Sequence, residues 1–308
     1  MKISIVGIGK VGATVGFQIA TQGIASELIL ISRNRDKTHG EVLDLRHAAA
    51  LTSGQMKIRA GGQEESAGSD VIVLTASNPL PFTEKGPDRL SLTTQNTELF
   101  LEMIPGLAKL SPDAIFLVVS NPVDILTYVT LRSSGFPAER VIGTGTLIDS
   151  ARFRAYLSDH LSIHPDDIRA YILGEHGDTQ FPVLSVSRAG GWSIANDPIV
   201  TELFEKTVSS GAQVVKAKGY TNFAASCSTI LILQAIRENS QRTMPASTLV
   251  QDFYGINDVC LSLPVVIGRT GIQRVLPLEL NESEQSKLRA SADSLKALLQ
   301  PLREQFSL

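Results

Sequence analysis

The chain has 308 residues, of which 43% are hydrophobic and 19% are charged, and its formal net charge is −3. This composition is that of a globular protein large enough for two lobes, and it gives no electrostatic reason to expect nucleic acid or an anionic membrane as a partner. The amino-terminal "MKISIVGIG" lacks the apolar region and cleavage site of a secretory signal, and no run of eighteen apolar residues occurs. We therefore expect a cytoplasmic protein that binds a small molecule.

Short, nearly continuous apolar runs occur in the first half of the chain. They are "ISIVG" (3–7), "LILI" (28–31), "DVIVLTA" (70–76) and "AIFLVV" (114–119). Runs of this kind are typical of strands that are covered on both faces. Helix-length amphipathic segments such as 89–110 separate them, so the pattern predicts a parallel, doubly wound α/β sheet.

The second half of the chain has a mixed pattern. A last strand followed by a long helix is expected over 140–161, and the boundary between a dinucleotide-binding domain (1–144) and a catalytic domain (145–308) is expected there. Further helices are expected near 198–218, 223–237 and 281–305, with an alternating strand in "DVCLSLPVVIG" (258–268). These elements predict an α+β domain.

The two cysteines, Cys227 and Cys260, are too few for a disulfide framework and are not spaced as metal ligands. We expect no metal, and we predict that both side chains are small core residues.

A glycine-rich turn follows the first predicted strand. "GIGKVG" (7–12) contains Gly7, Gly9 and Gly12 in the G-x-G-x-x-G spacing and opens a helix. Gly7 allows a tight turn, Gly9 lets a pyrophosphate approach the backbone, and Gly12 allows close packing of helix and strand. The position predicts a dinucleotide site, with Lys10 and Val11 in the same turn, although glycines that only form a tight turn remain an alternative.

The acidic residue that usually follows this turn is missing. About twenty residues beyond Gly12, where a carboxylate would bind the ribose hydroxyls, the chain has Ser32, followed by Arg33 and Arg35. A serine does not repel a 2′-phosphate, and the arginines offer positive charge to it. The pattern favours NADP(H) over NAD(H), with a solvated turn as the alternative.

A candidate chemical site is formed by residues far apart in the sequence. "GEHGD" (174–178) sets His176 between glycines, whereas His39 in "HGE" belongs to a helical stretch and is expected at the surface. "DSAR" places Asp149 and Arg152 three residues apart, hence on one helix face. Asn121 in "SNPVD" follows a predicted strand, and ligands bind at the carboxyl ends of such strands.

The blocks "GIGKVG", "SNPVD", "GTGTLIDSARFR", "GEHGD" and "KGYTNFA", in this order, resemble the lactate/malate dehydrogenase family, and in particular its L-lactate and L-2-hydroxyisocaproate branch. The resemblance covers essentially the whole chain. It implies a Rossmann domain plus a catalytic domain, hydride transfer between a nicotinamide cofactor and a 2-keto/L-2-hydroxy monocarboxylic acid, and a homodimer or homotetramer.

The resemblance also implies roles for individual residues. His176 would be the proton donor and acceptor, oriented by Asp149, because a histidine can deliver a proton near neutral pH. Arg152 would bind the substrate carboxylate, a bidentate task that suits guanidinium. Arg89 would polarise the reacting carbonyl. Further contacts to substrate or cofactor are expected from Asn96, Val119, Asn121 and Thr221.

The loop of residues 76–89 departs from the family pattern. It is about three residues longer than in ordinary lactate or malate enzymes, and it contains no arginine from Ser77 to Asp88 for a second substrate carboxylate. We therefore expect a monocarboxylate, lactate-sized or bulkier, selected by a residue among Leu80 to Thr83. Malate dehydrogenase activity is the alternative.

Two further hypotheses concern other ligands and other classes of protein. Arg154 and Arg169 fall where some bacterial lactate dehydrogenases bind fructose 1,6-bisphosphate, although paired surface cations are common. A non-catalytic NADP(H) sensor would not need the histidine and aspartate pair, and a nicotinamide-dependent glycoside hydrolase would need metal ligands that neither cysteine offers.

Overall fold

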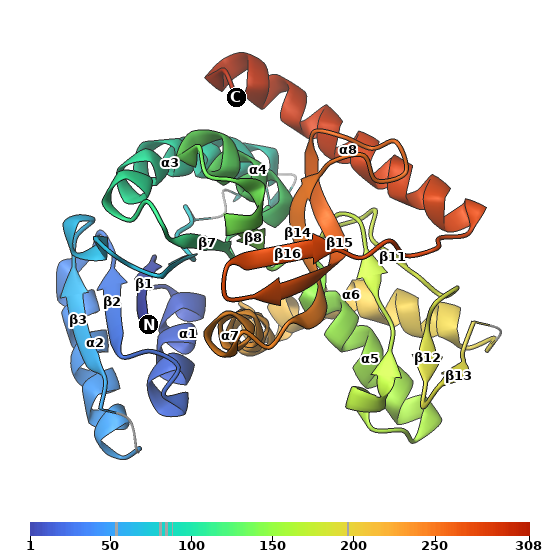
Figure 1. The fold of residues 1–308 in the computed structure, drawn as a ribbon, viewed down its shortest axis with the longest axis horizontal. Helices are drawn as coiled ribbons and strands as arrows, with labels where there is room; N and C mark the ends of the chain where they lie inside the picture. The colour runs from blue at the N-terminus through green and yellow to red at the C-terminus, as the bar shows by residue number, and fades with distance from the viewer. Residues whose placement is uncertain (53–54, 80–81, 84–85, 88, 196) are drawn as a thin grey trace.

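The computed structural model describes residues 1–52, 55–79, 82–83, 86–87, 89–195 and 197–308. A nine-stranded sheet, ordered β16-β15-β14-β8-β7-β4-β1-β2-β3, runs through the molecule (Figure 1). Its parallel part has the doubly wound order β3-β2-β1-β4-β7-β8. These strands are β1 (Lys2–Val6), β2 (Glu27–Ile31), β3 (Lys57–Gly61), β4 (Val71–Leu74), β7 (Ile115–Val118) and β8 (Val141–Gly143).

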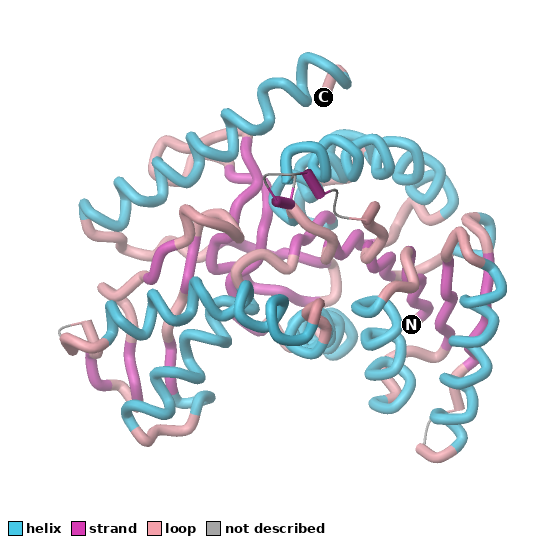
Figure 2. The backbone as a smooth tube through the Cα atoms, turned by 180° about the vertical axis from the view of Figure 1, so that it is seen from behind, coloured by secondary structure: helices cyan, strands magenta, loops and turns pink. Residues whose placement is uncertain are grey.

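The apolar runs form strands because both faces of the parallel sheet are covered. Ile72 and Leu74 of β4 belong to one hydrophobic cluster, while Val71 and Val73 of the same strand belong to the cluster on the other face. Helices α1 and α7 lie on one side of the sheet, and α3 and α4 lie on the other (Figures 1 and 2). The predicted doubly wound α/β sheet is confirmed.

The helices follow the predicted order. They are α1 (Lys10–Gln22), α2 (Arg35–Ala50), α3 (Arg89–Leu110), α4 (Val123–Ser134), α5 (Leu147–Leu161), α6 (Val200–Lys218), α7 (Phe223–Glu238) and α8 (Glu282–Phe306). Short 3₁₀ turns occur at η1 (Glu64–Ser66), η2 (Ala138–Arg140) and η3 (Pro165–Asp167). Asn281 caps α8 in a capping box with Glu284, which explains why this helix begins where the sequence predicted it.

The strand predicted at 258–268 belongs to the large sheet. β14 (Arg242–Val250), β15 (Val259–Gly268) and β16 (Gly271–Val275) form an antiparallel extension. A bridge between Gly143 and Ser247 joins this extension to β8. One sheet therefore connects the two halves of the chain.

Small sheets complete the second half of the chain. They are formed by β10 (Ile172–Leu173) with β11 (Phe181–Pro182), and by β9 (Ile168–Arg169), β12 (Arg188–Ala189) and β13 (Trp192–Ser193). A short pair, β5 (Phe82–Thr83) and β6 (Gly86–Pro87), lies in the loop before α3. A separate hydrophobic cluster around Phe153 and Leu157 packs α5 against β9, β10, β12 and α6.

One core prediction is wrong. Cys260 is buried in β15, as predicted, but Cys227 is exposed on α7. In this helix Ser226 and Ile230 face inward, and the position next to Ser226 is rotated by about 100° around the helix axis. Cys227 therefore faces outward, where it accepts a hydrogen bond from Gln18 Nε2 at 3.4 Å. Within the described part of the chain, no helix has the length and apolar character needed to cross a membrane.

Candidate active site

The glycine-rich turn has the geometry that its sequence predicted. Gly7 has φ +100°, and a Cβ there would lie 2.3 Å from the backbone nitrogen of Ala76. A Cβ on Gly12 would lie 2.1 Å from the carbonyl oxygen of Gly7. Both contacts are too close for any side chain, so these two glycines allow β1, α1 and the segment after β4 to pack together.

Gly9 serves a different purpose in the same turn. No atom lies within 4 Å of the place where its Cβ would be, and it precedes the first turn of α1, which contains Lys10 and Val11. The free N–H groups of a helix amino terminus attract phosphate, and the open space over Gly9 lets a phosphate come close. The turn therefore fits the pyrophosphate of a dinucleotide.

The end of β2 presents cations next to this turn. Ser32 is half-buried directly after the strand, and Arg33 and Arg35 are exposed. Arg33 Nη2 donates to Asn78 Oδ1 at 3.5 Å, across the gap between the ends of β2 and β4. No carboxylate occurs from Ser32 to Arg35, so the position where a ribose would be held carries hydroxyl and guanidinium groups.

The amide of Asn96 holds neighbouring loops together. Its Nδ2 donates to the carbonyl of Asn121 at 2.9 Å, and its Oδ1 accepts from the backbone N–H of Asn78 at 2.8 Å. The side chain is completely buried, so in this structure Asn96 shapes the cofactor side of the site through its neighbours. Val119 is half-buried and Asn121 is exposed, both just beyond the carboxyl end of β7.

His176, Asp149 and Arg152 meet in space. His176 Nδ1 lies 2.5 Å from Asp149 Oδ2, and Arg152 Nη1 donates to Asp149 Oδ1 at 3.0 Å. Only 2% of the Asp149 side chain is exposed, against 23% for His176 and 19% for Arg152. The carboxylate is thus covered by the two groups that would face a ligand. A Cβ on Gly211 of α6 would lie 3.3 Å from Arg152 Nη1, so this helix packs directly over the guanidinium.

The electrostatics of this pair favour a charged imidazole. Burial acts to lower the pKa of His176, but the Asp149 carboxylate outweighs it, and the pKa is raised above 6.5. Burial acts to raise the pKa of Asp149, but His176 and Arg152 together lower it. The arrangement can therefore hold a proton on His176 near neutral pH and keep Asp149 ionised.

The loop that carries His176 is anchored from several sides. Gly174 exchanges two backbone hydrogen bonds with Ser262 of β15, at 2.9 and 3.1 Å. The backbone N–H of Glu175 donates to Ser291 Oγ at 2.7 Å, and that of His176 donates to Asp124 Oδ2 at 2.7 Å. These contacts fix the position of the imidazole relative to the sheet.

Sequence reasoning missed Asp124. The residue ends the block "SNPVD" and lies in the first turn of α4, where acidic residues are common, so the sequence does not distinguish it from an ordinary acid at a helix start. The structure shows the distinction, because Asp124 is 3% exposed and contacts a residue 52 positions away in the chain.

Two further predicted site residues differ in how far the structure describes them. Thr221 is half-buried between α6 and α7. Arg89 begins α3, but its side chain lies outside the described part of the chain, as do Leu80 and the side chains of 82–83, so their predicted roles remain predictions.

The two arginines proposed for a phosphate lie near each other. Burial lowers the pKa of Arg154, and the neighbouring guanidiniums of Arg169 and Arg242 lower it further, against the opposing effect of Asp166. Mutual repulsion shows that positive charge is concentrated here. It does not identify a ligand, and binding of a sugar bisphosphate stays a prediction.

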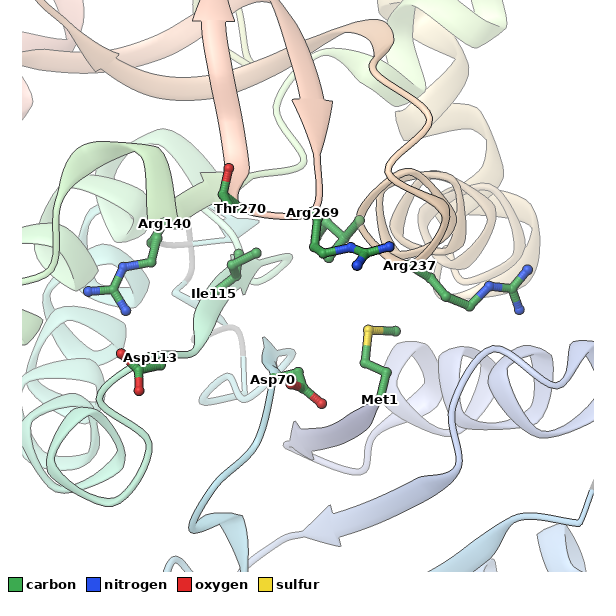
Figure 3. Close-up of a pocket in the computed structure, with 9 residues that line it drawn as sticks. Met1, Asp70, Asp113, Ile115, Arg140, Arg237, Arg269 and Thr270 are labelled. Atoms are coloured by element: carbon green, nitrogen blue, oxygen red, sulfur yellow. The ribbon is translucent and has the colours of Figure 1, made fainter.

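A cavity of about 540 Å³ lies at the other end of the sheet. Met1, Asp70 and Ile115 line it at the amino ends of β1, β4 and β7. Figure 3 shows Arg140 and Arg237 on opposite sides of the cavity, with their guanidiniums directed away from its centre. Ligands of open α/β sheets bind at the carboxyl ends of the strands, so this cavity is not the candidate active site. Among the described residues, no cluster of histidine, cysteine and carboxylate side chains could hold a metal.

Known proteins match this chain over nearly its full length. Residues 1–143 match the family model described as lactate/malate dehydrogenase, NAD binding domain, and residues 146–305 match the lactate/malate dehydrogenase alpha/beta C-terminal domain. An L-lactate dehydrogenase of Clostridium botulinum is 38% identical, with 97% of this chain and 96% of the relative covered. That of Clostridium perfringens is 36% identical, with 96% and 95% covered.

Solved structures show the same fold. A minor L-lactate dehydrogenase from Enterococcus mundtii has a TM-score of 0.93 and 33% identity, and the match covers 98% of each chain. A lactate dehydrogenase from a Medee basin deep-sea metagenome library has a TM-score of 0.93 and 32% identity, with 97% of this chain and 98% of that chain covered.

The dinucleotide turn and the histidine and carboxylate pair define the class of a nicotinamide-dependent oxidoreductase. The chain belongs to the lactate/malate dehydrogenase family. The relatives named above are lactate dehydrogenases, and they do not favour the malate alternative.

Proposed function

We propose that this protein is an L-lactate dehydrogenase-like enzyme that interconverts 2-keto and L-2-hydroxy monocarboxylic acids. The observation that carries the proposal is the contact of His176 Nδ1 with the buried carboxylate of Asp149, which also binds Arg152. These residues combine a proton donor, His176, with a cation, Arg152, that can bind the carboxylate of a substrate. The family membership of the whole chain supports the same conclusion.

The roles of the chain's own groups follow from this geometry. Because Nδ1 of His176 is bound to Asp149, Nε2 is the nitrogen that delivers a proton to the substrate oxygen during reduction. Asp149 stabilises the imidazolium before the transfer and orients the neutral ring afterwards. In the oxidation direction the same nitrogen accepts the proton from the hydroxyl group.

Two arginines would bind the substrate. Arg152 holds the substrate carboxylate with the N–H groups not directed at Asp149, and the charge of the guanidinium makes these bonds strong. Arg89 stabilises negative charge that develops on the carbonyl oxygen. Asn121 and Thr221 complete the polar surroundings of the substrate and the nicotinamide.

The cofactor we propose is NADP(H) in preference to NAD(H). When bound, the nicotinamide coenzyme supplies the hydride for C2 of the keto acid. Gly7, Gly9 and Gly12, with Lys10 and Val11, would hold the pyrophosphate. Val119 would line the nicotinamide side, and the buried Asn96 would shape it through its hydrogen bonds to Asn78 and Asn121. The preference is supported by Ser32 standing in the place of an acid and by the exposed guanidiniums of Arg33 and Arg35.

The substrate class follows from the loop before α3. The sequence has no arginine from Ser77 to Asp88, and Lys85 is the only cation in this segment, so a second carboxylate would find no guanidinium there. The residues from Leu80 to Thr83 are apolar or small, which suits an aliphatic or aromatic side chain of the keto acid. We therefore propose bulky monocarboxylates as substrates at least as good as pyruvate.

We further propose a homodimer or homotetramer in the cytoplasm. Helix α6, which leads into Thr221, exposes Val208, Val214 and Val215 by 40 to 48%, and apolar side chains grouped on one helix are typical of a subunit interface. Light scattering of the purified protein measures the oligomeric state, and a monomer at micromolar concentration would contradict this part of the proposal.

The test of this function is an absorbance assay at 340 nm. Purified protein is mixed with NADPH or NADH and with pyruvate, 2-ketoisocaproate, phenylpyruvate or oxaloacetate. The proposal predicts the highest kcat/KM for NADPH with a bulky monocarboxylate. A clear preference for NADH with oxaloacetate would refute both the cofactor and the substrate assignments, whereas no turnover with any keto acid would refute the function itself.

A further inference from the structure

A second buried carboxylate lies behind His176 and has no part in the chemistry proposed above. Asp124, in the first turn of α4, is 3% exposed, and its Oδ2 accepts the backbone N–H of His176 at 2.7 Å. Within the described part of the chain, Asp124 Oδ1 and Ser247 Oγ are both buried without a hydrogen bond, although Ser247 lies close enough to lower the pKa of Asp124. A buried acid that leaves one oxygen unpaired is costly for the fold, so its presence needs a reason.

The charges of Asp124 and His176 act on each other's pKa. Burial raises the pKa of Asp124 to about 6, while Ser247, the backbone N–H of His176 and the charge of His176 oppose the rise. The charge of Asp124 in turn helps to raise the pKa of His176, after the larger effects of burial and of Asp149. The other ionisable groups that act on one of these residues are Asp149 and Arg152 of α5, on His176, and Glu175, on Asp124. Burial raises the pKa of the Cys260 thiol in β15, and the charge of Asp124 raises it further.

We propose that Asp124 is a positioning residue that fixes the backbone of His176 from one side while Asp149 holds the ring from the other. His176 thus lies between two carboxylates, one at its main chain and one at Nδ1. The second negative charge favours the imidazolium that reduction requires. This inference rests on the proposed function, because it adds a residue to the same proton transfer.

Three variants separate the charge of Asp124 from its hydrogen bond. D124N keeps the shape and an acceptor oxygen for the His176 N–H but removes the charge. D124A removes both. S247A keeps Asp124 itself but removes the neighbour that lowers its pKa, so it reduces the charge without deleting the carboxylate.

The experiment measures kcat/KM for keto-acid reduction against pH in each variant of the full-length enzyme. We expect D124N to move the descending limb of the profile to lower pH by roughly half a unit or more, because one of two nearby negative charges is lost. D124A should in addition reduce the pH-independent kcat/KM by about tenfold or more, since the loop loses an anchoring hydrogen bond to a charged group. S247A should move the limb in the same direction as D124N but by less, because a higher pKa of Asp124 leaves a smaller fraction of the carboxyl charged near neutral pH. A D124N profile that superimposes on the wild type would overturn the inference.

A measurement that does not depend on turnover distinguishes this inference from the proposed function. Among the five histidines of the chain, the ring signals of His176 are assigned by their loss in H176N and then titrated by NMR. We expect a lower pKa of His176 in D124N than in the wild type, and an equal pKa would overturn the inference even if the enzyme is active. If D124N does not fold, the Cγ resonance of Asp124 in the wild type must respond when His176 titrates, and a silent resonance contradicts the proposed proximity.

Discussion

The glycine-rich turn and the His176 site are built by opposite means. At the turn, residues 7–12 create the site by what they lack, because side chains on Gly7 and Gly12 would collide with backbone at 2.3 and 2.1 Å. At His176, in the loop after β10, the buried carboxylate of Asp149 from α5 binds the imidazole and that of Asp124 from α4 binds the backbone N–H. The turn depends on open space and the His176 site on charge. Substitutions in the turn should therefore change cofactor binding and stability, and substitutions at His176 should change turnover.

The largest effect is expected for the imidazole itself. H176N should reduce kcat/KM by about 10²- to 10⁴-fold, because the general acid is lost. Binding of NADPH, measured by fluorescence titration, should not change, since the cofactor turn lies in the other half of the chain. H39N provides the control, because His39 is exposed on α2. Equal losses in both variants would show that the pairing with Asp149 is not what matters.

The guanidinium of Arg152 should come next. R152K keeps the charge but loses the bidentate geometry, so we expect kcat/KM to fall by about 10- to 150-fold, the equivalent of one charge-assisted hydrogen bond. The loss should appear mainly in KM for the keto acid. Steady-state kinetics with R46K, a change at an exposed arginine of α2, gives the reference. An unaltered KM in R152K would remove the arginine from substrate binding.

The turn itself is tested by a matched pair of alanines. G12A should destabilise the fold by about 1–3 kcal/mol through overpacking and should weaken cofactor binding. G9A places its methyl group in open space, so its melting temperature should stay near that of the wild type while cofactor affinity falls. Thermal unfolding with and without NADPH measures both quantities. Equal melting temperatures for G12A and wild type would show that the close contact with Gly7 is not required.

The smallest effect concerns the choice between the two coenzymes. S32D introduces the carboxylate that repels a 2′-phosphate and binds a ribose, so the ratio of kcat/KM for NADH to that for NADPH should rise by about tenfold, or 1.4 kcal/mol. S32A, which adds no charge, should leave the ratio close to the wild type. A ratio unaffected by S32D would contradict the role given to this position.

The contrast between the glycine-rich turn and the His176 site also explains which features the sequence could predict. The buried strands and the glycine turn follow from local patterns, and the structure confirms them. β3 was not predicted because only Ile58 of this edge strand is buried, so it lacks the apolar run of its neighbours. Cys227 was predicted wrongly because residue type alone does not tell which face of α7 is covered.

The His176 site required information beyond local patterns. His176 and Asp149 are 27 positions apart and His176 and Asp124 are 52 apart, and no spacing rule links them. The resemblance to the family indicated Asp149, whereas nothing in the sequence separated Asp124 from an ordinary acid at a helix start. The nine-stranded sheet was also not foreseen, because the bridge between Gly143 and Ser247 is a contact of two distant segments.

The pH dependence of the wild-type enzyme tests the proton transfer most directly. Because Asp149 raises the pKa of His176 above 6.5, kcat/KM for reduction should be constant below that pKa and fall tenfold per pH unit above it, as the imidazolium is lost. For oxidation of the hydroxy acid, kcat/KM should rise with pH through the same pKa, since the neutral ring accepts the proton. Opposite limbs that share one pKa above 6.5 are the predicted result. Profiles without a limb in this range, or with limbs of the same sign, would contradict the assignment of His176.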